Sequence, residues 1–344
     1  MTELVQVEPA GGGTGHALRA ALSLSAATGL GFEMRRIRER RPRPGLSSGH
    51  VAAVRAAALC CSATVHGGFD GSPELRFQPG PVRGGDFRFE VTAGDAATLL
   101  AQLVVPPLAA AGEPSRIAVT GATHVPGGPP YDYVARHWAA LLDRLGLPVR
   151  FELVRAAFQR AASGELRAVL GAWPRPRGLR LESRGALLRV AGTSGAARLP
   201  GEVAERLRES ARARLWEAKR IDASWDIATF PSASPGSYVL LEAVFEQTRA
   251  AWCLLGERGE RPEALGDRAA RRLLAFLDGE GAVDPSAADQ LAVPLALAGD
   301  GGSISTSVVT EELEGVVDVV RRFGIPARCW GRRGGPGGVE VERC

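Results

Sequence analysis

The sequence predicts a layered α/β fold, and three observations lead to this prediction. Apolar residues recur at helical spacing in several stretches, and short β-prone runs follow them, as at residues 96–110 and then 116–119. The chain has 344 residues, 45% of them hydrophobic, which is enough to bury a substantial core. Residues 173–180 are rich in proline and arginine, which is typical of a connector, and the composition of the sequence differs before and after them. We therefore expect a separate small α/β domain after this connector.

The N-terminal part is predicted to form a strand at residues 4–7, a flexible glycine loop at 11–15 and a helix at 18–27. Such a loop leaves backbone N–H groups free at the helix N-terminus, which suits a phosphate. The glycines lack the order of a dinucleotide-binding fingerprint, however, and a tight turn between strand and helix is the commoner explanation. The loop alone does not identify a nucleotide site.

The remaining elements follow from the same two periodicities. Helices are predicted where apolar residues lie three or four positions apart, at residues 47–63, 96–110, 129–145, 200–220, 287–298 and 311–323. Strands are predicted for short β-prone runs, at residues 116–119, 149–153, 238–245, 250–255, 327–330 and 339–342.

Positive charge in this chain is carried almost entirely by arginine. The net charge is +4, and Lys219 is the only lysine. A phosphate-binding loop of the Walker type requires a Gly-Lys-Ser/Thr triplet, and a lysine-adenylate ligase requires a Lys-x-Asp-Gly element. The sequence has neither, so both classes of enzyme are excluded.

The composition also predicts where the protein resides. No apolar stretch reaches the ~18 uninterrupted residues of a membrane helix, and the N-terminus lacks the basic-then-apolar order of a signal peptide. The five cysteines are scattered without metal-type spacing. We expect a reduced cytoplasmic protein with no membrane contact and no structural zinc.

Six arginines fall within the nine residues 35–43, and Pro42 and the following Pro44 interrupt any regular element there. Such a strip is either a solvated loop or an anion-binding surface. Guanidinium groups present a fixed fork of donors that matches phosphate, and the prolines stiffen the loop that carries them. Binding of phosphate or nucleic acid is therefore slightly favoured.

Short motifs spread along most of the chain agree in order and spacing with those of one protein family. They are Ala17-Leu18-Arg19, Ala21-Leu22-Ser23-Leu24-Ser25, Arg43-Pro44-Gly45-Leu46, Phe77-Gln78-Pro79-Gly80, Arg83-Gly84-Gly85-Asp86, Gly256-Glu257-Arg258 and Ala288-Asp289-Gln290-Leu291. With these motifs the chain resembles the RNA 3'-terminal phosphate cyclases from the first strand to about Phe323. The resemblance implies a large domain, residues 1–181 and 281–344, built from three repeats that each pair two helices with a four-stranded sheet, as in the enolpyruvyl transferases. It also implies that a smaller α/β domain, residues 182–280, is inserted before the third repeat.

The family activity implied by this resemblance depends on ATP. An active-site histidine attacks the α-phosphate of ATP, AMP passes to an RNA 3'-phosphate, and the neighbouring 2'-hydroxyl displaces AMP to form a 2',3'-cyclic phosphate. A divalent metal, Mg or Mn, assists. The expected cofactors are therefore ATP and this metal, and the expected partner is an RNA 3' end.

The resemblance also implies candidate site residues, position by position. Those at family arginine or lysine positions, expected to bind phosphate or RNA, are Arg19, Arg38, Arg41 and Arg43. Those at ATP-contacting positions are Gln102, Ser286, Ala287, Ala288, Asp289 and Gln290. His50 matches a further family position in the phosphate-binding set, and its alternative interpretation is a histidine that orders the arginine loop.

The chain departs from the family where the nucleophilic histidine is expected, because Glu312 stands in its place. All five histidines lie within the first 137 residues. The nucleophile must be a neutral nitrogen that leaves readily from a phosphoramidate, whereas a carboxylate would give a mixed anhydride that water hydrolyses. The first glycine loop also lacks the family's acidic metal contact, and His16 replaces a glutamine there. These changes predict loss or alteration of the original chemistry and leave the metal ligands unidentified.

Three functions remain open after the sequence has been considered. The chain is an adenylyl-transferring enzyme on RNA 3' ends with altered chemistry at Glu312, a non-catalytic RNA-binding homologue, or an enzyme of the same architecture acting on a small anionic metabolite. Family resemblance and the arginine strip favour RNA, whose binding depends steeply on salt. From the sequence alone we expect no covalent nucleotide on the protein after incubation with ATP.

Overall fold

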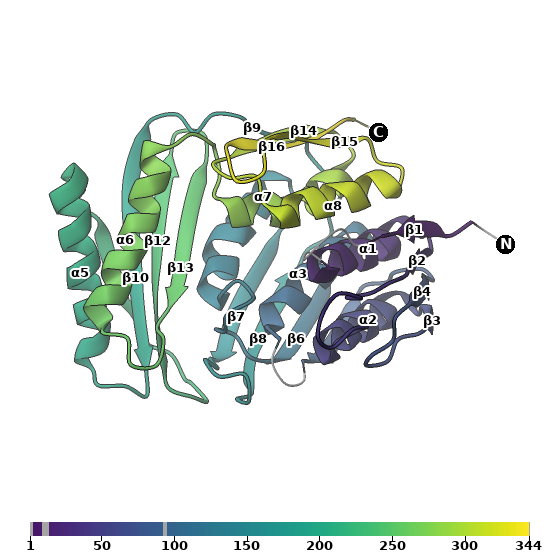
Figure 1. The fold of residues 1–344 in the computed structure, drawn as a ribbon, viewed down its shortest axis with the longest axis horizontal. Coiled ribbons are helices and arrows are strands. Elements are labelled where there is room, and N and C mark those ends of the chain that lie inside the picture. Colours follow the sequence, from purple (N-terminus) through teal and green to yellow (C-terminus); the bar gives the residue numbers. More distant parts are fainter. Residues whose placement is uncertain (1–2, 9–13, 92–94, 344) are drawn as a thin grey trace.

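The computed structural model describes residues 3–8, 14–91 and 95–343, and it confirms a mixed α/β fold. Within these residues the chain forms eight α-helices, one short π-helical segment and four sheets of four strands each (Figure 1). None of the helices in the described ranges is long and apolar enough to cross a membrane.

Three of the four sheets belong to units that repeat the same order of elements, which is strand, helix, strand, helix, strand, strand. The first unit comprises β1 (Val5–Val7), α1 (Thr14–Thr28), β2 (Phe32–Met34), α2 (Ser48–Cys61), β3 (Thr64–His66) and β4 (Leu75–Gln78). The second comprises β5 (Gly85–Glu90), α3 (Ala97–Ala110), β6 (Ser115–Gly121), the π-helical η1 (Tyr133–Trp138) continued by α4 (Ala139–Arg144), β7 (Val149–Arg155) and β8 (Gly164–Leu170). The third comprises β9 (Leu179–Leu181), α7 (Pro285–Ala298), β14 (Gly302–Thr306), α8 (Glu311–Arg322), β15 (Ala327–Gly331) and β16 (Gly337–Val341).

The strand pairing confirms that these units are three copies of one design. In each sheet the first strand pairs parallel with the second, and the fourth strand pairs antiparallel with both the second and the third. The resulting orders are β1-β2-β4-β3, β5-β6-β8-β7 and β9-β14-β16-β15. A parallel pair needs a crossover, and α1, α3 and α7 supply it in the three units.

The fourth sheet is built by the chain between β9 and α7. This segment comprises β10 (Leu187–Ala197), α5 (Glu202–Lys219), β11 (Ser224–Ala228), β12 (Gly236–Phe245), β13 (Arg249–Leu255) and α6 (Pro262–Asp278). Its four strands pair in the order β11-β10-β12-β13. Both helices pack on one face of this sheet over a core of their own, which includes Leu207, Leu241 and Leu273 (Figure 1). The predicted boundaries of this small domain, 182–280, stay a prediction.

Arg184 joins the two ends of the segment that forms the fourth sheet. Its guanidinium group donates to the carbonyl oxygens of Phe276 at 2.8 Å and Leu277 at 3.0 Å, in the last turn of α6, and of Gly279 at 2.8 Å, just after the helix. The same group lies over the rings of Phe276 and Phe245. The chain therefore leaves the third repeat and returns to it at nearly the same place.

The helices of the three repeats share one hydrophobic core. α1 contacts α2, α3, α7 and α8, so it lies at the centre of the helical layer (Figure 1). The largest fully buried side chains of this core include Trp138, Phe32 and Phe77. The helices of different repeats thus face one another across this core.

Several sequence predictions need correction in detail. The first helix begins at Thr14 rather than at residue 18, and the predicted glycine loop falls largely on residues 9–13, outside the described ranges. The predicted connector, residues 173–180, extends too far, because β9 already begins at Leu179. α6 was not predicted, although Pro262 at its first turn and apolar residues at helical spacing are typical of a helix.

Candidate functional site

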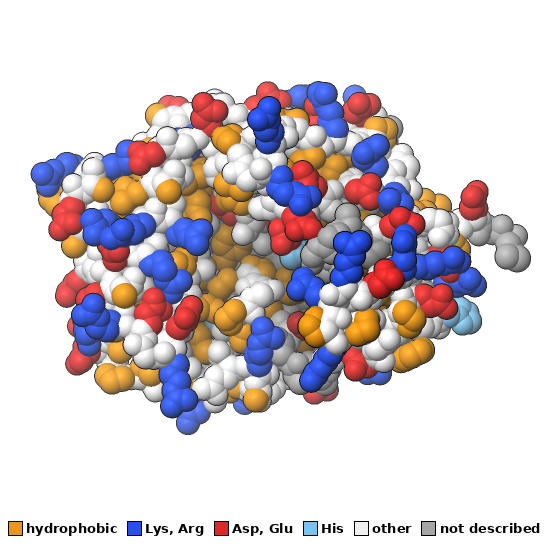
Figure 2. Space-filling view, in the orientation of Figure 1, with side chains coloured by type: hydrophobic (Ala, Val, Ile, Leu, Met, Phe, Trp, Pro, Cys, Tyr) orange, Lys and Arg blue, Asp and Glu red, His pale blue; other side chains and the backbone are white. Residues whose placement is uncertain are grey.

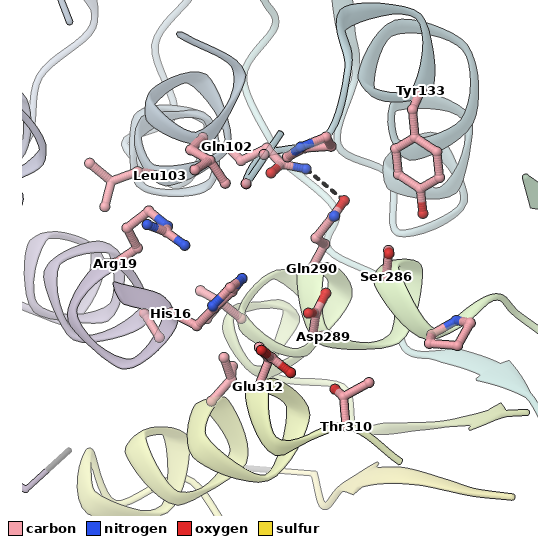
Figure 3. Close-up of a pocket in the computed structure, with 18 of the residues that line it drawn as sticks. His16, Arg19, Gln102, Leu103, Tyr133, Ser286, Asp289, Gln290, Thr310 and Glu312 are labelled. Atoms are coloured by element: carbon pink, nitrogen blue, oxygen red, sulfur yellow. Dashed lines mark hydrogen bonds between the residues drawn. The ribbon is translucent and has the colours of Figure 1, made fainter. Parts of the chain in front are cut away.

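A cavity of about 490 Å³ lies where the three repeats meet the small domain. Its walls come from α1, α3, η1, α7, the start of α8 and strand β13 (Figure 3). Figure 2 shows the hollow between the fourth sheet on the left and the repeats on the right, with hydrophobic side chains along it. A largely apolar cavity with a few polar groups is typical of a small-molecule site.

Six of the predicted site residues line this cavity, although they come from three different repeats. They are Arg19, Gln102, Ser286, Asp289, Gln290 and Glu312. Ala287 and Ala288 lie on the same turn of α7, but their side chains are buried in the core and do not line the cavity. Arg38, Arg41, Arg43 and His50 lie outside its walls.

Gln102 and Gln290 bridge the second and third repeats across the cavity wall. The Gln102 amide Nε2 donates to Gln290 Oε1 at 2.7 Å, which joins α3 to α7 (Figure 3). The indole of Trp138 donates to the main-chain carbonyl of Gln290 at 3.4 Å. Two amides held in this way keep further donors and acceptors directed at a ligand.

The first turn of α7 is fixed by Asp284, a carboxylate that is only 1% exposed. Its Oδ1 accepts from the Tyr133 hydroxyl at 2.7 Å and from the backbone N–H of Ala287 at 3.0 Å. Its Oδ2 accepts from the backbone N–H of Ala251 at 3.3 Å and is hydrogen-bonded to His137 Nε2 at 2.8 Å. Burial alone would raise the pKa of Asp284, but these partners outweigh it and hold the pKa below its usual value.

The Asp284 network was not found in the sequence. Tyr133 and His137 are far from Asp284 along the chain, so no local pattern links them. The available signal was Asp284 followed by Pro285, which is typical of an N-cap and the first helical position. The network matters for the cavity because it positions Ser286 and Tyr133 in its wall.

Asp289 and Glu312 place two carboxylates in one part of the cavity (Figure 3). Burial, with the nearby Glu312 and Asp284 carboxylates, raises the pKa of Asp289 well above its usual value, and Arg19 offsets this only in part. Asp289 Oδ1 is buried without a hydrogen-bond partner among the described residues. An oxygen in this state fits a role as a ligand to a cation.

In the part of the chain that the structure describes, no three metal-ligating side chains come together. Magnesium, however, is commonly held through one or two carboxylates together with the phosphates of a substrate. Asp289 and Glu312 are the carboxylates of the cavity that could hold such an ion. They do not form a complete metal site by themselves.

Arg19 supplies a positive charge to the cavity. Burial lowers the pKa of Arg19 to about 10, and the Asp95 and Asp289 carboxylates act in the opposite direction. The group therefore remains charged at neutral pH. Gly15 makes room for it, because a Cβ there would lie 3.3 Å from both Arg19 Nη1 and His50 Nε2.

Two histidines near Arg19 are neutral at physiological pH. Burial and the Arg19 charge lower the pKa of His16 to about 4. Burial, Arg19 and Arg38 lower the pKa of His50 to about 4. The two rings therefore carry no charge, and the positive charge beside them comes from Arg19 and Arg38.

The arginine loop, residues 35–45, is built against the start of α2. Arg38 has a φ of 53° and donates from Nη1 to the Gly45 carbonyl at 3.2 Å. Gly45 has a φ of 82° and packs so closely on Gly71 that a side chain would collide with its carbonyl. Arg41 and Arg43 are exposed. The backbone of the loop is thus fixed while arginine side chains face solvent.

His50 closes this loop onto α2. The backbone N–H of Ser47 donates to His50 Nδ1 at 3.2 Å, and the His50 N–H donates to Ser47 Oγ at 3.4 Å, which completes a capping box. The geometry fits the interpretation of His50 as a residue that orders the arginine loop. The Nε2 atom of His50 points toward Gly15 and Arg19.

Comparison with known proteins gives one consistent result. A family model described as RNA 3'-terminal phosphate cyclase matches residues 10–326. A protein named RNA 3'-terminal phosphate cyclase from Pseudomonas fluorescens is 39% identical over 326 residues, which cover 95% of this chain and 94% of that protein. A protein of the same name from Methylococcus capsulatus is 38% identical, covering 92% of this chain and 89% of that protein.

Among solved structures, the enolpyruvyl transferase NikO from Streptomyces tendae is similar to this chain. The match covers 98% of this chain and 48% of that chain, with 12% identity and a TM-score of 0.37. A likeness this weak has no bearing on function.

Proposed function

The chain belongs to the RNA 3'-terminal phosphate cyclase family, and on this basis we propose that its cavity binds ATP and that it acts on the 3'-phosphate ends of RNA. The observation that carries the proposal is the assembly of one cavity from three repeats, with Arg19 on one wall and the Gln102–Gln290 pair on another. The family reaction depends on ATP, so a nucleotide pocket is required.

The residues of the cavity suit the parts of a nucleotide. Arg19 is a charged donor for a phosphate, and Gln102 and Gln290 are donors and acceptors for a base or ribose. Leu103, Pro106 and Val293 add apolar surface for the face of a base. The volume of about 490 Å³ lies within the range of roughly 300–1,000 Å³ common to small-molecule sites.

The arginine loop suits the RNA end. His50 lies near both Arg19 and Arg38, so positive charge continues from the cavity to the loop. Figure 2 shows basic side chains over the repeats to the right of the hollow, all of them arginines because the single lysine, Lys219, lies on α5. A terminal phosphate on this path would reach the nucleotide, and exposed Arg41 and Arg43 would neutralise the phosphates behind it.

A divalent cation, if bound with the nucleotide, would neutralise phosphate charge as it develops during transfer. Asp289 and Glu312 would hold it, and Arg19 would neutralise the remaining oxygens. Tyr133 and Pro130 also line the cavity.

Glu312 gives weight to a second candidate function, a non-catalytic homologue that binds RNA 3' ends. A carboxylate at this position cannot form a phosphoramidate with AMP. The two functions make different predictions for turnover but the same predictions for binding.

The test combines calorimetry with an end-group assay. We expect magnesium ATP to bind the wild-type chain, and Arg19→Gln to weaken this binding by about 10- to 100-fold, since a hydrogen bond to a charged group contributes about 1.5–3 kcal/mol. Arg150→Gln, an exposed arginine on β7, serves as the control and should bind ATP like wild type.

The end-group assay uses an RNA oligomer with a 3'-phosphate and measures whether that end becomes resistant to phosphatase. Resistance that depends on ATP supports the cyclase, whereas binding of both ligands without it supports the non-catalytic homologue. Failure of the wild-type chain to bind ATP would refute the proposal.

A further inference from the structure

His16 is a histidine that faces the cavity from a different helix than Glu312. Resting on the ATP-binding function proposed above, we propose that His16 is the catalytic nucleophile of this chain and carries AMP as a covalent phosphoramidate. The nitrogen that position 312 lacks would then come from the first turn of α1.

The position of His16 is distinct from those of the other histidines. His124 and His137 are fully buried and hydrogen-bonded to Asp132 and Asp284. His50 uses its Nδ1 in the capping box of α2. His66 lies exposed on β3. Among the described residues, His16 is the histidine that lines the cavity.

The surroundings of His16 suit phosphoryl transfer. Figure 3 shows its ring directed into the cavity, between Arg19 on one side and the carboxylates of Asp289 and Glu312 on the other. Within the described chain, neither ring nitrogen has a hydrogen-bond partner, so a lone pair is available to a ligand. Arg19, one turn further along α1, is placed to neutralise the phosphate that the ring would attack.

The protonation state of His16 supports the same role. With its pKa lowered to about 4 by burial and Arg19, the imidazole is unprotonated at neutral pH. An imidazole that must first lose a proton would attack a phosphorus only as its minor neutral form. His16 needs no such step.

The reaction balances without a further reactant. The lone pair of the unprotonated ring nitrogen attacks the α-phosphorus of ATP and forms a P–N bond. The bond from that phosphorus to the bridging oxygen breaks, and pyrophosphate leaves with the electron pair. The N–H proton on the other ring nitrogen passes to solvent or to the Glu312 carboxylate. An oxygen of the RNA 3'-phosphate then attacks the same phosphorus, the P–N electron pair returns to that ring nitrogen, and the other ring nitrogen takes back a proton from solvent or from the Glu312 carboxyl group, which restores the neutral imidazole.

The test uses ATP labelled at the α-phosphate, magnesium and the full chain, followed by denaturation. We expect a label that is lost in acid and resists alkali, as a histidine phosphoramidate does, whereas a mixed anhydride on a carboxylate is lost in alkali. Trypsin separates the two candidate carriers, because residues 1–19 form one peptide with His16 as its single histidine, and residues 273–321 form another that holds Glu312 and no histidine. The label should be on the first peptide.

Two variants complete the experiment. His16→Gln should lose the label by about 1,000-fold or more, as expected for removal of a nucleophile. It should still bind ATP by calorimetry, which shows that the variant is folded. His66→Gln, at an exposed position far from the cavity wall, should be labelled like wild type.

Each outcome decides the matter. Label on the peptide of residues 1–19 that disappears in His16→Gln supports the proposal. Label on the peptide of residues 273–321, sensitive to alkali, would overturn it in favour of Glu312. ATP binding without any label would also overturn it but would leave the proposed nucleotide site intact. Absence of ATP binding would refute the proposed function itself.

Discussion

Replacement of Asp284 by asparagine tests whether one buried carboxylate holds the cavity walls together. Asp284 accepts hydrogen bonds from the Tyr133 hydroxyl and from the backbone N–H groups of Ala251 and Ala287, and it is also bonded to His137. These partners belong to the second repeat, the small domain and the third repeat. Asp284→Asn keeps the size of the side chain and removes its charge and one acceptor oxygen.

The cost can be worked out from the two orientations of the new amide. If its nitrogen replaces Oδ2, the Ala251 N–H faces another donor, and if it replaces Oδ1, the Ala287 N–H does. A buried donor left without an acceptor costs about 1–3 kcal/mol, and the surviving hydrogen bonds lose the strength that the charge gave them. We therefore expect a loss of about 3–5 kcal/mol in the free energy of unfolding, as for breaking a buried charged network.

Urea denaturation of wild type and Asp284→Asn measures this loss. Because the pKa of Asp284 is lower in the folded state, its contribution is complete above the unfolded value of about 3.9 and disappears as the pH falls through the folded value. The difference between the two proteins should be constant from about pH 5.5 to 8 and shrink only below about pH 4. A matched control, Asp318→Asn, removes a partly exposed carboxylate paired with Arg322 and should cost under about 0.5 kcal/mol.

Two results would refute this reasoning. A loss below about 1 kcal/mol would mean that the amide satisfies the same donors. A difference that grows as the pH falls would mean that the carboxylate is destabilising in the folded chain. ATP binding provides a second readout, since a loosened α7 should misplace Ser286 and weaken binding.

Two further predictions concern the arginine loop and the buried thiols. Arg43→Gln should reduce the slope of log K against log salt for a 3'-phosphorylated RNA by about 0.7, as for one phosphate contact on a single strand; an unchanged slope would remove Arg43 from the RNA path. Cys60 and Cys61 are buried on α2, and burial raises the pKa of both thiols, to about 11 for Cys61. Neither should react with a thiol reagent at pH 7.4 until urea unfolds the chain, and rapid labelling of either in the native protein would contradict their burial.

The repeat architecture was predictable only in part from the residues themselves. The bounds of α3 were predicted almost correctly, because its apolar residues keep helical spacing on both sides of Pro106 and Pro107. β10 was missed although it has eleven residues. Glycine in place of larger residues makes it a poor match to strand patterns, yet a Cβ at Gly192 would collide with the Trp225 ring and one at Gly195 with Tyr238. Packing between strands required these residues, and no local pattern shows that.

The candidate site shows the same limit. Arg19, Gln102 and Asp289 could be selected by resemblance, and the structure brings all three to one cavity. His16 was noticed in the sequence only as a substituted residue, since its relation to Glu312 depends on how α1 and α8 pack. Contacts between distant segments carry the information that linear patterns lack.

The hydrogen bonds that Arg184 makes to the end of α6 have a consequence for how the chain folds during its synthesis. β9 emerges from the ribosome early but pairs with β14, from Leu179 to Gly302, only after the whole intervening segment has been synthesised. Closing so long a loop is entropically unfavourable in an unfolded chain. Once the fourth sheet has folded and Arg184 has bound the carbonyls at the C-terminal end of α6, the two ends are already adjacent, and the loop that remains to be closed consists mainly of α7 and its flanking residues. Folding of the small domain can thus bring α7 and β14 close to β9, the strand with which β14 pairs.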